Sequence, residues 1–164
     1  MDFDAFIKSV QELPMPNLAI NGLSVELSVL LIAVVFGLFQ LLIAARVGNS
    51  QRGLAWNVGA RDAEPPKVSA LAGRLERAYR NFMETFPFMA AAILIAHVTG
   101  RDSWMTLLGA QMYLAARVVY WPLYAAGVPV LRTLVWLVSL VGIFLVIAAC
   151  FMAPASLPAV APGV

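Results

Sequence analysis

Residues 74–98 read RLERAYRNFMETFPFMAAAILIAHV, a helix-length stretch that is charged in its first half and apolar in its second. At about 100° per residue, four polar side chains of the first half share an arc of roughly 80°. They are Arg74, Arg77, Asn81 and Glu84. Charges at membrane depth cost about 2.5–3.5 kcal/mol each and usually face a bundle interior or a cavity. We therefore expect a binding site on this face.

The composition excludes an ordinary soluble domain. The chain is 62% hydrophobic and 12% charged, whereas soluble domains are about 25% charged. Stretches long enough to cross about 30 Å of hydrocarbon as helices alternate with Gly- and Pro-containing breaks. We expect an all-α integral membrane protein with one domain, a four-helix transmembrane bundle. The expected spans are residues 24–46, 71–99, 104–126 and 130–152.

The segments outside the spans suggest how the chain lies in the bilayer. Residues 1–16 have apolar residues at helical spacing, which predicts a short interfacial helix, although a mobile tail is equally compatible. Most Lys and Arg residues flank or lie in the loop at residues 47–70. By the positive-inside rule, the first and third loops are cytoplasmic and both termini are outside. The net charge of only +2 favours anionic lipid or a small anion as partner over nucleic acid.

The third expected helix carries a second polar stripe. On a helical wheel, one arginine and three tyrosines share an arc of about 60°. They are Tyr113, Arg117, Tyr120 and Tyr124. Because they extend over about three turns, they cannot all lie at one membrane interface. Some of them must point into the protein.

The two stripes could simply satisfy each other. In that interpretation Glu84 pairs with an arginine, Asn81 forms a hydrogen bond across the helices, and nothing binds. The numbers of charges argue against it, since five arginines face three carboxylates. The arginines are Arg74, Arg77, Arg80, Arg117 and Arg132, and the carboxylates are Glu26, Glu76 and Glu84. The excess positive charge near the membrane surface favours an anionic ligand.

Other chemistry is sparse in this sequence. Cys150 is the single cysteine, and His97, the single histidine, lies about 140° around its helix from Glu84. We therefore expect no metal site, and no GxSxG, P-loop or paired-carboxylate motif occurs. An enzyme of this kind would need a nucleophile brought by a ligand. A soluble thiol such as glutathione fits, because arginines can hold its carboxylates and nearby positive charge favours its thiolate.

Residues 77–84, RAYRNFME, followed by Pro87, match the signature R-A-x-x-N-x-x-E. With the helix-three pattern, the chain resembles the membrane-associated proteins in eicosanoid and glutathione metabolism, as a bacterial-type member. The resemblance implies a homotrimer that holds glutathione between subunits and takes lipophilic substrates from the bilayer. It implies that glutathione is bound by Arg77, Asn81, Glu84, Arg117, Tyr120 and Tyr124, to which the two stripes add Arg74 and Tyr113. Arg132 would stabilise the thiolate as the catalytic residue.

The expected function is a glutathione transferase or peroxidase that acts on lipophilic electrophiles or lipid hydroperoxides. A second hypothesis remains open, a non-catalytic lipid-binding or scaffolding subunit of a larger membrane assembly with the same fold. A third, a small multidrug exporter, is disfavoured. A cation–proton exchanger needs a pocket dominated by carboxylates, whereas arginine is in excess here.

Overall fold

The computed structural model describes residues 20–62 and 64–152, and this part of the chain is all-helical. Within it there are five helices: α2 (Val25–Arg52), α3 (Leu54–Val58), α4 (Ala70–Val98), α5 (Trp104–Ala126) and α6 (Pro129–Phe151). The all-α prediction is confirmed. The interfacial helix predicted at residues 1–16 lies outside the described residues.

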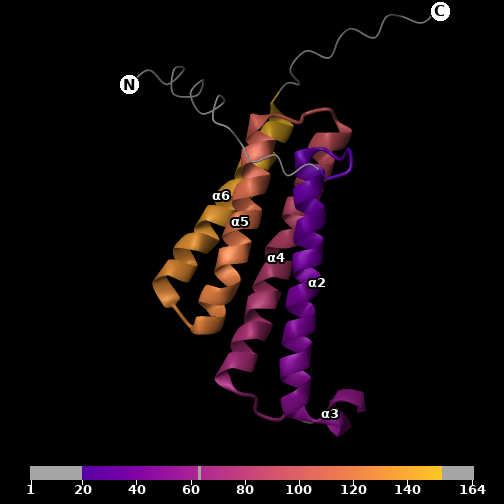
Figure 1. Ribbon diagram of the computed structural model, residues 1–164, viewed down its shortest axis with the longest axis vertical. Coiled ribbons are helices and arrows are strands. Elements are labelled where there is room, and N and C mark those ends of the chain that lie inside the picture. The colour runs from indigo at the N-terminus through magenta and orange to yellow at the C-terminus, as the bar shows by residue number, and fades with distance from the viewer. Residues whose placement is uncertain (1–19, 63, 153–164) are drawn as a thin grey trace, which may run out of the picture.

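The four long helices form two pairs, and α4 of the first pair contacts both helices of the second. Helices α2 and α4 run side by side, and α5 and α6 form a hairpin beside them (Figure 1). Helix α4 packs against α2, α5 and α6, whereas α5 also contacts α2. The α2–α4 pair extends past the turn between α5 and α6, and α3 lies at that far end (Figure 1). Helix α4 is therefore the central helix, so its polar stripe can meet side chains of the hairpin.

Within the described residues, three helices are long and apolar enough to cross a membrane: α2, α4 and α6. They make the chain an integral membrane protein, as its composition predicts. Helix α5 has 23 residues, as many as α6. It is less apolar, because it carries Arg117 and the tyrosine stripe.

The first long helix ends later than expected, at Arg52 instead of residue 46. Polar side chains continue the helix because α4 provides partners for them. Arg52 and Glu76 form an ion pair, with Nη1 and Oε1 2.6 Å apart. The Gln51 side chain accepts from the Ser69 amide at 2.7 Å, and Ser69 is the N-cap of α4. These contacts align the end of α2 with the start of α4.

Small residues set the distances between helices in the core. Gly37 of α2 faces the ring of Phe82, where a Cβ would lie 2.7 Å from the ring carbon Cε1. Gly109 of α5 and Gly142 of α6 touch each other, and a Cβ on Gly142 would lie 2.6 Å from the carbonyl oxygen of Gly109. The hairpin is therefore packed through its backbones, as is common for helices in membranes.

Candidate functional site

A cavity of about 340 Å³ opens between α4, α5 and α6. One face of α4, the last turns of α5 and the first turns of α6 form its walls. Its lining residues are Arg77, Arg80, Asn81, Glu84, Tyr120, Tyr124, Arg132, Thr133 and Trp136. Both polar stripes of the sequence therefore contribute to one cavity.

The cavity carries net positive charge, since three arginines and one glutamate line it. Among the residues that the structure describes, Arg52 forms an ion pair with Glu76, and His97 Nδ1 contacts Asp102 Oδ2. Glu84 is therefore not neutralised by an ion pair there. It accepts a hydrogen bond from Asn81 Nδ2 at 3.4 Å. Of the alternative to a binding site, the pairing of Glu84 with an arginine is not formed within the described residues, whereas the hydrogen bond of Asn81 across the helices is formed, with Arg117 of α5.

Arg117 lies behind the cavity and is almost completely buried, with 1% of its surface exposed. Its Nη1 donates to Asn81 Oδ1 at 2.8 Å, and its Nη2 donates to Thr85 Oγ1 at 2.5 Å. The guanidinium also lies against the rings of Tyr113 and Tyr120, at 5.4 and 5.5 Å from their centroids. Arg117 is not among the lining residues, so its place in the site is to fix Asn81 and the α5 tyrosines.

Tyr113, the first residue of the α5 stripe, is fully buried in the core. Its hydroxyl oxygen lies 3.3 Å from Thr85 Oγ1, and it does not line the cavity. Thr85 therefore has Arg117 and Tyr113 as neighbours. The buried part of the stripe forms a polar layer that joins α4 and α5.

The wall across the cavity from α4 contains two tyrosine rings of α5 and one arginine of α6. The rings of Tyr120 and Tyr124 meet edge to face, with centroids 5.5 Å apart. The guanidinium carbon of Arg132, on α6, lies 4.4 Å from the centroid of Tyr124. Cation–π contacts of this kind contribute about 0.5–2 kcal/mol. They hold the Arg132 side chain beside the cavity instead of leaving it free in solvent.

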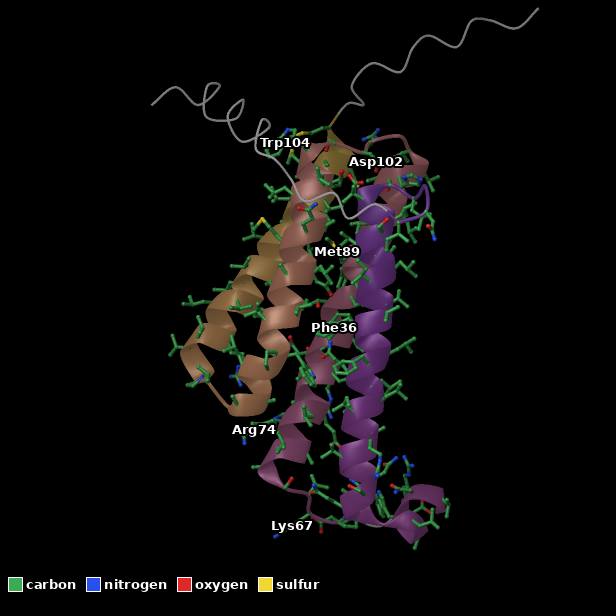
Figure 2. The ribbon with its side chains drawn as sticks, viewed as in Figure 1. Phe36, Lys67, Arg74, Met89, Asp102 and Trp104 are labelled. Atoms are coloured by element: carbon green, nitrogen blue, oxygen red, sulfur yellow. The ribbon has the colours of Figure 1, made fainter. Side chains whose placement is uncertain are left out.

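Arg74 shares a face of α4 with the site residues but is not in the cavity. Its Nη1 donates to the carbonyl oxygen of Ala126 at 3.3 Å, beside Gly127, which ends α5 in the left-handed conformation. Figure 2 shows Arg74 next to the turn between α5 and α6. A cation at the C-terminus of a helix offsets the negative end of its dipole. The observed contact of Arg74 is thus with the end of α5.

Three lining residues were not assigned to the site from the sequence: Arg80, Thr133 and Trp136. Arg80 lies at i+3 from Arg77, so helical spacing alone could have placed it. Trp136 lies one turn after Arg132, and its indole Nε1 is buried with no hydrogen-bond partner among the described residues. A buried donor without a partner normally costs about 1–3 kcal/mol. The hydrogen-bonding capacity of this N–H is therefore unused among the described residues.

The family model of the MAPEG family matches residues 29–152. This range runs from α2 to the end of α6 and contains every lining residue of the cavity. The chain belongs to the MAPEG family. Comparison with curated proteins gives no match, and comparison with solved structures gives none either. Membership of the MAPEG family supports a membrane role related to glutathione or eicosanoid chemistry in general.

Proposed function

We propose that this MAPEG protein binds glutathione in the cavity between α4, α5 and α6 and activates its thiol toward lipophilic electrophiles or lipid hydroperoxides. The observation that best supports this proposal is the charge of the cavity, which is lined by three guanidinium groups and one carboxylate. Glutathione at neutral pH has the complementary set, two carboxylates and one ammonium group. Arginine pairs with carboxylate through two parallel hydrogen bonds, which add energy and orientation.

The residues divide into groups with different roles in this proposal. Arg77 and Arg80 hold the carboxylates, and Glu84 accepts from the ammonium group. Asn81, held by Arg117, and the hydroxyls of Tyr120 and Tyr124 form neutral hydrogen bonds to the ligand. Arg132 lies near the thiol and favours its thiolate form, because nearby positive charge lowers the pKa of a thiol.

The chemistry requires only glutathione and the substrate. In the transferase reaction the thiolate attacks an electrophilic carbon and a C–S bond forms. In a substitution the bond to the leaving group breaks and the leaving group departs with its electron pair. In an addition a C=C π bond breaks and the resulting carbanion takes up a proton. In the peroxidase reaction the thiolate attacks the outer peroxide oxygen, and the O–O bond breaks to give a sulfenic acid and a lipid alkoxide. The alkoxide takes up the proton released by the thiol and becomes the lipid alcohol. A second glutathione reduces the sulfenic acid to water and the disulfide.

We also propose that all four long helices cross the membrane and that three copies of the chain assemble. Arg77, Arg80 and Glu84 are exposed in the single chain, and exposure of such charges to lipid is costly. A neighbouring copy would cover them and close the cavity. Crosslinking and native mass spectrometry on protein in detergent should give a trimer. Detection of monomer alone at high protein concentration would contradict the shared site.

The decisive experiment combines calorimetric titration of glutathione with a difference absorbance spectrum of the bound thiolate. Arg77→Ala should weaken binding at least about tenfold, since a charge-assisted hydrogen bond contributes roughly 1.5–3 kcal/mol. Lys67→Ala is the matched control, because it removes the same charge from an exposed loop residue outside the cavity. Binding without a thiolate signal would favour the non-catalytic lipid-binding alternative. No binding at all would remove glutathione from the proposal.

A further inference from the structure

Helix α3 exposes two large apolar side chains outside the membrane-crossing helices. Leu54 and Val58 are each 76% exposed. They lie at i and i+4, so they project from the same side of the helix. Exposed apolar residues of α2 or α6 face lipid because those helices cross the bilayer, but this explanation does not cover α3. Two adjacent apolar side chains exposed on one side of a short helix form a small apolar patch, which is the kind of surface that contacts a partner or a membrane.

The position of α3 is fixed by α2. Gly53 ends α2 with a φ of 84°, which turns the chain sharply into α3. The Asn57 side chain then donates from Nδ2 to the carbonyl oxygen of Asn49 at 3.0 Å. Arg61 donates from Nη2 to the carbonyl oxygen of Asn57 at 2.8 Å. Because the Asn57 bond joins α3 to the last turn of α2, and the Arg61 bond joins α3 to the loop that follows it, the apolar pair has a defined direction.

The length of α2 places α3 at the surface of the bilayer. Helix α2 has 28 residues, which at 1.5 Å per residue span about 42 Å. A bilayer including its headgroup regions is about 40–45 Å thick. The end of α2 therefore reaches the headgroups. Trp56 lies on the side of α3 opposite Leu54 and Val58 and is half-buried. Tryptophan is enriched at headgroup depth, whichever side of the helix it occupies.

Helix α3 also projects sideways from the molecule. Figure 1 shows it beside the end of α2, on the side away from α5 and α6. It therefore lies above the lipids that surround α2 and not above the α5–α6 hairpin. Figure 2 shows Lys67 at the same end of the molecule. The loop charges nearly cancel, since Arg61 and Lys67 are accompanied by Asp62 and Glu64.

We propose that α3 is an interfacial anchor whose Leu54 and Val58 insert into the phospholipid leaflet at which α2 ends. Because the positive and negative charges of the loop nearly cancel, the contact between α3 and the lipid is driven by the apolar side chains and not by attraction of basic residues to anionic lipid. It should therefore form on neutral phospholipid and persist at high salt. This inference does not depend on glutathione binding. An experiment that excludes glutathione from the cavity would therefore not affect the proposed lipid contact of α3.

The test places a nitroxide spin label at residue 54 or 58 of the full chain in phospholipid nanodiscs. The labelled variants are Leu54→Cys and Val58→Cys, each with Cys150→Ser, and Glu64→Cys is the matched control in the exposed loop. At positions 54 and 58, collisions with oxygen should exceed those with a water-soluble nickel chelate, and the control should show the reverse. Labels at 54 and 58 that resemble the control would overturn the proposal. Dipolar broadening between labels would also overturn it, because a second copy would then cover α3.

A second measurement keeps the native apolar side chains. Brominated phospholipids quench tryptophan fluorescence at short range, and the contribution of Trp56 is the difference between the natural chain and Trp56→Phe. We expect quenching of this contribution by neutral brominated lipid, and its loss in the double variant Leu54→Asp, Val58→Asp. Equal quenching in the double variant would show that the apolar pair does not anchor α3.

Discussion

The Nη1 of Arg117 on α5 donates a hydrogen bond to Oδ1 of Asn81 on α4, with a length of 2.8 Å. Because Asn81 Oδ1 accepts from Arg117, its Nδ2 is directed to Glu84, 3.4 Å away. A buried cation thus orients two polar side chains that line the cavity. In the function proposed above, Arg117 acts on glutathione through these side chains, as a positioning residue.

Arg117→Met should weaken glutathione binding at least about tenfold, because Asn81 loses its orienting partner and hydrogen bonds to charged groups contribute about 1.5–3 kcal/mol. Arg117→Lys should recover binding only in part, since an ammonium group cannot make the forked contacts of a guanidinium. Calorimetric titration with glutathione measures the affinity of both variants. Unchanged affinity in Arg117→Met would show that Asn81 is oriented without it.

Arg132→Leu should leave the protein assembled and glutathione bound while it removes the thiolate absorbance. Loss of this positive charge raises the pKa of the bound thiol, and each unit lowers the thiolate fraction at neutral pH about tenfold. The pH–rate profile with a model electrophile should therefore move to higher pH. Arg132→Lys is the control that keeps the charge. Full thiolate signal in Arg132→Leu would make Arg132 only an anchor to lipid phosphate.

Arg74→Ala should lower stability without changing glutathione affinity, in contrast to Arg77→Ala one turn later on α4. Arg74 donates to the last carbonyl of α5, at Ala126, and a cation at a helix C-terminus stabilises by about 0.3–1 kcal/mol. Thermal unfolding in detergent and calorimetry measure the two effects separately. A large loss of affinity in Arg74→Ala would place Arg74 in the ligand site of the assembled protein.

Gly142→Ala should destabilise the α5–α6 hairpin by about 1–3 kcal/mol, the usual cost of overpacking. The new Cβ would lie 2.6 Å from the Gly109 carbonyl oxygen and 3.0 Å from the Tyr113 amide nitrogen, so backbones must move apart. Gly73→Ala is the matched control, because its nearest contact is the flexible end of Arg77, 3.2 Å away. We expect the control to be neutral or slightly stabilising. Equal melting temperatures for both variants would contradict the backbone contact.

Helical periodicity predicted much of the fold and part of the site. Apolar length and breakers gave helices near the observed ones, and the spacing of Arg77, Asn81 and Glu84 was enough to put them on one face of α4. The extension of α2 to Arg52 and the helix α3 were not predicted. Both depend on contacts made after folding, the pairing of Arg52 with Glu76 and the capping of Asn49 by Asn57.

The sequence by itself determined that this chain lies in a membrane and that two helices carry polar stripes, because hydropathy and the helical period are local properties. It could not determine which stripe residues line the cavity. Arg74, Arg77 and Arg117 look alike in the sequence, yet one contacts the end of α5, one lines the cavity and one is buried behind it. That division depends on the distance and rotation between helices. Backbone contacts such as Gly109 with Gly142 set these quantities, and they exist only in the tertiary structure.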